Sequence, residues 1–394
     1  MRRISGFSII LLAAVVSVLW LDSCRKHKIE VVQQQEAMTF GISSRGTKAL
    51  IGSKEALVVN SYNSGTGFGV YGYKRTEVAG SDNPTYYLNF DNIEVLPNSA
   101  DENTTWHYSP TRYWDSNSNV SYQFIAYWPH FRKQNESGSG PYASEGSGTF
   151  YIHDFPCWQD CSSASCADLM TDIRRGSYSA GLFTDQNQIQ SSKVQFTFSH
   201  VLAKLTIRAY YIGLKTNHIK VTGLRLTNGG DTEKRILSSD GTVEYSQLFR
   251  GGSGLPTFTA ANNQTEPLGT TAHVLYSSNQ GLELPETTWD DEDQDDTDHT
   301  YQEICTWLMI PCSGWEDLGL AVDYSIGGTA TIPSNISGLT IRTNINNEEK
   351  TQTASGKSYI LTLKFDSKGG SIDLESVLIK NWSVKEIETG VYNW

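Results

Sequence analysis

The alternation of apolar and polar residues between positions 193 and 211 constrains the fold of this chain more than any other feature. Apolar residues occupy even positions up to Phe198 and odd positions from Val201 onward. A period of two is typical of β-strands, and a shift of one residue turns the two faces of a strand over. The pattern therefore predicts two strand segments that each bury one face, with a bulge or sharp bend at Ser199–His200.

Similar patterns recur along the chain, and no segment shows a long period of 3.6 residues. The segments that alternate or are rich in strand-forming residues are 39–42, 68–73, 122–128, 318–326 and 359–365. In 122–128 the apolar residues fall on both faces, which predicts a strand buried on both sides. Many short strands separated by turns indicate an all-β protein built from β-sandwich domains.

The length of 394 residues fits two such domains. The polar run DQNQIQSS precedes the alternating segment. We therefore predict an N-terminal β-sandwich over residues 39–190 and a C-terminal one over residues 191–394.

Charge and motifs argue against several classes of function. Acidic residues outnumber basic ones, 43 to 31, which argues against nucleic acid as a partner. The hydrolase pattern G-x-S-x-G and the zinc pattern H-E-x-x-H are both absent. The acidic block 290–298 has the spacing of a calcium loop but lacks its glycine and its final glutamate. We predict no catalytic residue, no metal site and no cofactor.

The cysteines leave their pairing open. Cys157, Cys161 and Cys166 lie close together in a Ser/Asp-rich loop, and Cys305 and Cys312 follow far along the chain. The loop is compatible with one local disulfide and a remaining thiol, with thiols alone, or with a metal site that lacks a fourth ligand.

The first residues have the layout of a secretory signal peptide. Two arginines, at positions 2 and 3, precede an apolar run over residues 7–21, and Cys24 follows. A cysteine at the cleavage position resembles a bacterial lipoprotein signal, although an ordinary signal peptide is the alternative. On this hypothesis residues 1–23 are removed, and Cys24 becomes the first mature residue and carries acyl chains such as palmitate. Residues 24–38 then form a lipidated spacer.

Several segments in order resemble the fimbrillin family of Bacteroidales-type bacteria, the subunits of type V pili. After the lipoprotein signal, the segments that carry the resemblance are 40–48, 68–73, 122–129, 198–205 and 308–311, with Trp382 near the end. The resemblance implies two tandem transthyretin-like β-sandwich domains and a structural or adhesive role. It also implies a lipoprotein precursor at the outer membrane and a mature subunit in a fimbrium at the cell surface.

The resemblance further implies an assembly route. A trypsin-like protease cuts after the first strand, and a strand from the C-terminal region of a neighbouring subunit fills the groove that opens. Arg45, followed by Gly46, is the predicted cleavage site, and Lys48 is the second choice. The predicted partners are other pilus subunits, the outer membrane through the Cys24 lipid, and a host glycan or protein as an adhesion target.

The predicted donor strand and one rival function complete the hypotheses. The donor residues are Val377, Ile379, Trp382 and Val384, although Val377 and Ile379 equally fit an ordinary last strand of their own sandwich. The rival function is a surface glycan-binding lipoprotein that does not polymerise. It would use exposed aromatic side chains, with the candidates Trp106, Trp114 and Trp289.

Overall fold

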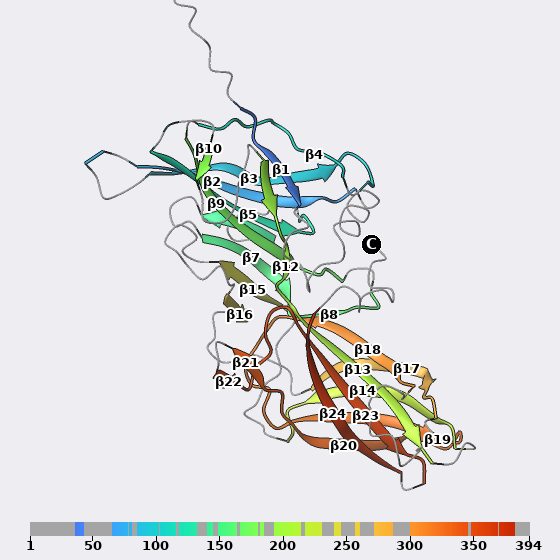
Figure 1. Cartoon of the computed structure of the whole chain (residues 1–394). Helices are drawn as coiled ribbons and strands as arrows, with labels where there is room; N and C mark the ends of the chain where they lie inside the picture. The colour runs from blue at the N-terminus through green and yellow to red at the C-terminus, as the bar shows by residue number, and fades with distance from the viewer. Residues whose placement is uncertain are drawn as a thin grey trace, which may run out of the picture. The chain divides into compact units, whose positions relative to one another are not determined.

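The computed structural model confirms the prediction of an all-β fold. It describes residues 36–42, 65–77, 79–80, 85–101, 103–115, 117, 119–131, 140–144, 149–163, 166–179, 182–184, 193–213, 217–230, 240–245, 257–260, 272–286, 300–345, 348–368 and 370–382. Every regular element in these ranges is a strand, and the strands form sandwich-like layers (Figure 1). The same ranges contain no helix with the length and apolar character needed to cross a membrane.

A seven-stranded sheet organises the first part of the chain. Along one path its strands are β10 (Leu182–Thr184), β9 (Met170–Ser179), β5 (Val120–Trp128), β2 (Phe68–Thr76), β3 (Thr85–Pro97) and β4 (Trp106–His107), and β12 (Ser199–His200) also pairs with β9. The central strand β5 alternates between two cores. Phe124 packs in one core and Tyr127 in the other, which confirms the predicted burial on both faces.

Two thinner layers cover the faces of this sheet. On the Phe124 side lies a parallel pair, β1 (Thr39–Ile42) and β11 (Lys193–Phe196). On the Tyr127 side lies a four-stranded sheet in the order β16 (Thr257–Ala260), β15 (Asp240–Tyr245), β7 (Thr149–Pro156) and β6 (Gly140–Ser144). The ring of Phe150, from β7, lies 5.7 Å from the ring of Tyr127.

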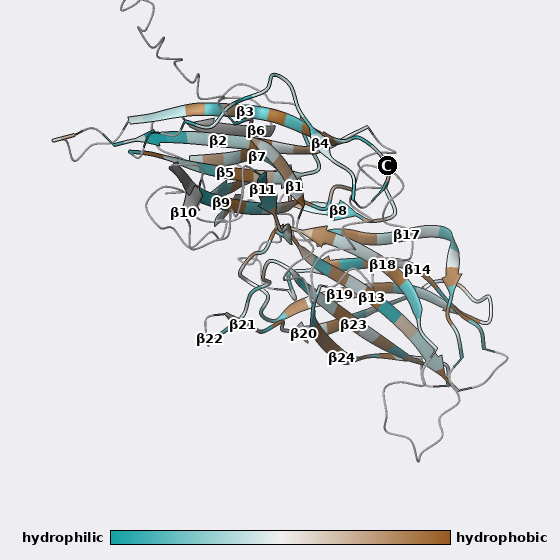
Figure 2. Cartoon of the chain, turned by 45° about the horizontal axis from the view of Figure 1, so that its top comes forward, coloured by the Kyte–Doolittle hydropathy of each residue, from teal (hydrophilic) through white to brown (hydrophobic). Residues whose placement is uncertain are grey.

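Two further sheets pack around the rest of the apolar cluster that contains Tyr127. One has the order β24 (Ser371–Asn381), β23 (Lys357–Asp366), β13 (Ala203–Ile212), β18 (Gln302–Met309) and β8 (Trp158–Asp160). The other has the order β17 (Ala272–Glu283), β14 (Ile219–Thr227), β19 (Leu318–Ile326) and β20 (Ile332–Leu339), and β21 (Thr343–Ile345) pairs with β22 (Glu348–Lys350) nearby in sequence. The rings of Tyr324 and Phe365 meet edge to face between these sheets, 5.3 Å apart. Figure 2 shows brown residues interspersed with pale and teal ones along the strands, as period-two burial requires.

The predicted change of phase near Ser199–His200 marks a change of core. Phe198 is buried with β1 and β11, whereas Val201 is buried in the other apolar cluster. The short β12 lies between them, so the bend keeps both apolar sets inside.

Sheet pairing crosses the division that we predicted at residue 190. The strand β8 pairs with β18, and β15 pairs with β7. Both sheets therefore combine strands from the two halves of the sequence. The boundaries 39–190 and 191–394 stay a prediction.

Candidate functional site: the seat of strand β1

The predicted site residues fall into two groups. Cys24, Arg45, Gly46, Lys48 and Val384 lie outside the described residues, and so do Trp289 and the acidic block 290–298. The described members are Val377 and Ile379 in β24 and Trp382 directly after it.

The strand predicted to be removed in maturation is part of a core. In β1 and the residue before it, Met38, Phe40 and Ile42 point inward and are 1%, 1% and 6% exposed, whereas Thr39 is exposed. This follows from the period of two in the sequence. The strand pairs in parallel with β11, with Phe40 opposite Val194.

Phe40 lies inside a group of four aromatic side chains from separate parts of the chain, which we call the aromatic cage. Its ring centroid lies 5.2 Å from that of Phe90, 5.3 Å from Tyr108, 5.6 Å from Phe124 and 5.8 Å from Phe196. The contacts with Phe90 and Phe124 are edge to face, the arrangement that the ring quadrupole favours. The cage therefore forms a shaped, apolar seat for one large side chain.

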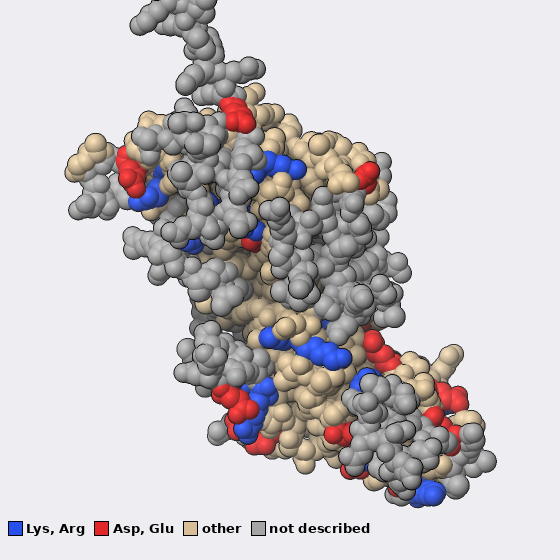
Figure 3. Space-filling view, in the orientation of Figure 1, with Lys and Arg blue, Asp and Glu red and all other residues tan. Residues whose placement is uncertain are grey.

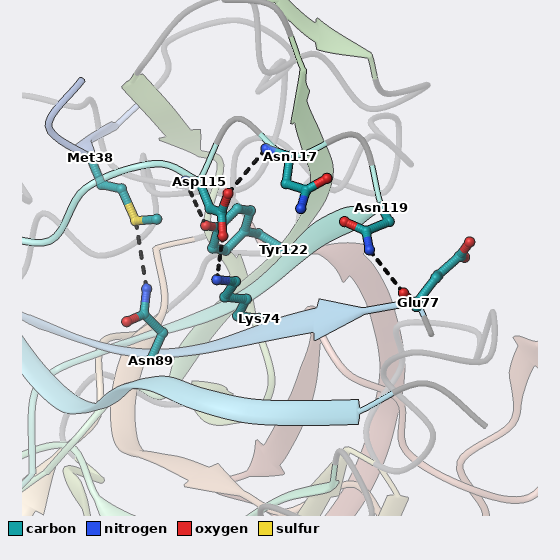
Figure 4. A network of polar contacts seen from close by, with 8 residues as sticks. All are labelled: Met38, Lys74, Glu77, Asn89, Asp115, Asn117, Asn119 and Tyr122. Carbon is teal, nitrogen blue, oxygen red and sulfur yellow. Dashed lines mark hydrogen bonds and ion pairs between the residues drawn. The ribbon is translucent and has the colours of Figure 1, made fainter. Parts of the chain in front are cut away.

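Hydrogen bonds hold the start of β1 against the cage. The Met38 amide donates to the carbonyl of Arg112, and the Tyr108 hydroxyl donates to the carbonyl of Met38, both at 2.9 Å. The Asn89 amide lies 3.9 Å from the Met38 sulfur, as Figure 4 shows. Burial raises the pKa of Tyr108, so its hydroxyl remains a donor at neutral pH.

An ion pair fixes the neighbouring loop. Lys74 on β2 lies 2.5 Å from Asp115 (Figure 4), and this hydrogen bond lowers the pKa of the Asp115 carboxyl. The Asp115 amide donates to the Tyr122 hydroxyl at 2.9 Å. These bonds position Trp114, whose ring lies 4.9 Å from that of Tyr122.

Two of the tryptophans proposed for glycan stacking are in the wrong place for it. Trp106 is 7% exposed and Trp114 is 1% exposed. Both belong to the core that β1 covers, so neither offers a ring face to a sugar. For these two residues the glycan hypothesis is wrong, because their aromatic surface packs the interior.

The described part of the predicted donor segment pairs within its own sheet. In β24, Val377 lies opposite Leu361 and Ile379 opposite Tyr359 of β23, and both are half-buried against the core. This is the placement of an ordinary last strand, the alternative left open by the sequence. The donor role of these residues stays a prediction.

Trp382 makes a contact that the sequence did not reveal. It is 1% exposed and stacks on His200, with centroids 3.9 Å apart and an interplanar angle of 9°. The Nδ1 atom of His200 lies 2.8 Å from a carboxylate oxygen of Asp168. The His200 and Asp168 side chains are 0% and 2% exposed, so a structural role fits better than a catalytic one.

Neither a charged patch nor a cluster of metal ligands marks a binding site in the described ranges. On the face in Figure 3, basic and acidic side chains are scattered among neutral ones, without a basic stripe across the described residues. No group of three or more His, Cys, Asp or Glu in those ranges is placed to hold a metal ion.

Comparison with known proteins agrees with this architecture. A family model described as fimbrillin-like matches residues 55–382, which is most of the chain. The chain belongs to the fimbrillin-like family. The resemblance stated from the sequence is thereby confirmed. A search of curated proteins found no match to this chain.

One solved structure supports the fold of this fimbrillin-like chain, and two others are similar to it at lower TM-scores. A fimbrial protein from Bacteroides vulgatus superposes with a TM-score of 0.54 at 17% identity, over 88% of this chain and 99% of that one. A putative cell adhesion protein from Bacteroides uniformis gives a TM-score of 0.45 at 15% identity, over 89% and 99%. The tip fimbrial protein Mfa3 from Porphyromonas gingivalis gives 0.30 at 10% identity, over 80% and 92%.

Proposed function

We propose that this chain is a structural or adhesive subunit of a fimbria at the cell surface, without catalytic activity. It is exported as a lipoprotein acylated on Cys24, and proteolysis then exchanges its first strand for one from a neighbouring subunit. Family membership supports the pilus role, since the family is fimbrillin-like. The observation that carries the strand exchange is the burial of Phe40 in the aromatic cage.

The seat of β1 has the properties that strand exchange needs. The strand pairs with β11 in a two-stranded sheet, so its removal frees one edge of β11. It also uncovers the sites of Met38, Phe40 and Ile42. Three side chains at about 1.5–3 kcal/mol each correspond to roughly 5–9 kcal/mol of burial. A strand from another subunit regains both the backbone pairing and the burial.

The proposed cleavage site lies close behind this strand. Arg45 follows Ile42, the last residue of β1, by three positions. A cut after Arg45 separates β1, and the lipid on Cys24 with it, from the rest of the chain. The subunit then leaves the membrane with an open slot.

The N-terminus of the protein isolated from cells tests this route. We expect the mature wild-type chain to begin at Gly46 and the Arg45→Ala chain to begin at an acylated Cys24 and to stay monomeric. Lys48→Ala is the matched control and should mature like the wild type. An Arg45→Ala chain that still starts at Gly46 and assembles normally would sink the proposed site.

The donor strand is proposed to come from the C-terminal region, with Val377, Ile379, Trp382 and Val384 entering the slot of the next subunit. The strand β24 stands at one end of its sheet order, with β23 as its neighbour, which supports this role. Because it is paired in the single chain, it must separate from β23 before it can be donated.

A reversible lock on β24 tests the donor. Lys357 and Asn381 lie directly opposite each other in the antiparallel pair β23 and β24, which is a suitable placement for two cysteines to form a disulfide. Oxidised Lys357→Cys/Asn381→Cys protein should fail to polymerise, and a reductant should restore assembly. Polymers that form equally well from the oxidised variant would place the donor elsewhere and leave β24 as an ordinary last strand.

A further inference from the structure

We propose that Cys161 and Cys166 form a disulfide when the chain meets an oxidising compartment. The inference rests on the export step of the proposed function, because disulfides persist outside the cytoplasm. In the structure both residues carry thiols, and the Cys166 Sγ donates to the Cys161 Sγ at 3.7 Å. Cys161 is 7% exposed and Cys166 is 2% exposed.

The backbone already holds the two sulfurs close together. Cys161 directly follows β8, and its amide donates to the carbonyl of Thr306 on β18 at 3.0 Å. The Cys166 amide donates to the carbonyl of Ser163 at 3.1 Å. A disulfide needs the sulfurs at about 2.05 Å, so they must approach by a little under 2 Å. Rotation of the two short cysteine side chains supplies most of that movement.

Another described cysteine has a different environment. Cys312 accepts a hydrogen bond from the Trp315 ring nitrogen at 3.2 Å and lies 4.0 Å from the Thr353 hydroxyl. The Cys166 Sγ, by contrast, already lies 3.7 Å from the Cys161 Sγ. This short distance points to Cys161 and Cys166 as the pair.

A cavity lies beside one residue of the pair. Its volume is about 530 Å³, and its lining includes Asp160, Cys161, Lys204, Cys305 and Trp307. Cys166 is not part of that lining, so Cys161 is the sulfur that a reagent meets first. The hydrogen bond from Cys166, together with burial, raises the pKa of Cys161, and Lys204 opposes this only in part. Oxidation is therefore faster at alkaline pH, since the thiolate is the attacking species.

Oxidised glutathione can serve as the oxidant that forms the disulfide. The Cys161 thiolate attacks one sulfur of glutathione disulfide, which forms a mixed disulfide and releases one glutathione. Cys166 then attacks the Cys161 sulfur and releases the second glutathione. Two protein thiols lose two electrons, and their two protons end on the two glutathione thiols.

The disulfide would steady the segment that supports the end of β24. Asp168 follows Cys166 by two residues and holds His200 at 2.8 Å, and His200 stacks on Trp382. Tying Cys166 to the end of β8 restricts the approach of the chain to Asp168. The oxidised form therefore keeps Trp382 more firmly in its place.

Thiol counting on the purified full chain tests the pair. The protein is incubated with oxidised glutathione at pH 8.5, quenched in acid, denatured and alkylated, and its peptides are identified by mass spectrometry. We expect Cys161 and Cys166 to become protected together in the wild type and in Cys312→Ser, and dithiothreitol to reverse the protection. Oxidation should raise the melting temperature by about 2–4 °C.

Two variants and a second source of protein complete the test. Cys161→Ser should leave Cys166 open to alkylation, whereas Cys166→Ser should trap Cys161 as a mixed disulfide with glutathione. If Cys161 and Cys166 of the wild type both remain open to alkylation after the oxidation step, or if either pairs with Cys157 or Cys305, the inference is overturned. The same peptides from protein isolated from cells test export separately. A pair that oxidises in vitro but is reduced in cells counts against the exported lipoprotein, not against the pair.

Discussion

Replacing Phe40 with alanine tests directly whether β1 fills a core. The side chain is 1% exposed and contacts all four rings of the aromatic cage. Removing a buried phenylalanine ring costs about 3–5 kcal/mol, because burial is lost and a cavity remains. We expect the undocked form of β1 to become roughly a thousandfold more populated, since about 4 kcal/mol corresponds to that factor.

Hydrogen exchange followed by mass spectrometry measures this undocking. The measurement uses the uncleaved precursor in a Cys24→Ser/Arg45→Ala background, so that the lipid is absent and β1 stays attached. Amides of β11 that exchange through undocking should lose protection in Phe40→Ala. Urea unfolding followed in parallel shows whether the rest of the chain keeps its stability.

A matched substitution on the same strand provides the control. Thr39 is exposed, so Thr39→Ala should change exchange in β11 by less than threefold, within about 0.5 kcal/mol. If Phe40→Ala also changes that exchange by less than fivefold, Phe40 does not hold β1 in place. The argument for a slot that another strand fills would then fail.

Three further substitutions probe other parts of the fold. Burial raises the pKa of Asp172 to about 6, although the neighbouring Arg174 acts to lower it. The protonated carboxyl therefore stabilises the fold fully below about pH 4, and this contribution is lost as the pH rises through 6. Relative to Asp172→Asn, wild-type stability should therefore increase by about 2–3 kcal/mol from pH 7.5 to pH 4, as urea midpoints would show. Trp382→Ala should cost about 3–5 kcal/mol and raise hydrogen exchange in β24, because the stack on His200 is lost. Gly72→Ala should lower the melting temperature, because the added Cβ would lie 2.7 Å from Phe90 and should cost about 1–3 kcal/mol of stability. An unchanged melting temperature would contradict this tight packing.

Local patterns in the sequence predicted the strands and their faces well. Residues 122–128 carry apolar side chains at both odd and even positions, and the structure buries Phe124 and Tyr127 in different cores. The shift of phase after Phe198 likewise marked the passage between cores. Both inferences rest on the strict period of a strand, which is a property of the backbone and not of its neighbours.

Those patterns could not predict which distant strands pair with each other. Nothing in the three residues of β8 or the six of β15 indicates that they pair with strands from the other half of the chain. The same holds for Trp106 and Trp114, whose aromatic character fits a sugar site and a core equally well. Which of the two applies depends on what packs against the ring, and that is decided by contacts far apart in sequence.

The layered arrangement supports the proposal that this chain keeps its fold when β1 is removed. The seven-stranded sheet buries Tyr127 against Phe150 on the face away from β1, and that core contains no residue of β1. Phe40, by contrast, belongs only to the core under the β1–β11 layer. Removing β1 therefore opens one face of the sheet while the other remains packed, which leaves a defined slot instead of an unfolded domain. A slot of this kind stores the binding energy of a strand until a neighbouring subunit supplies one.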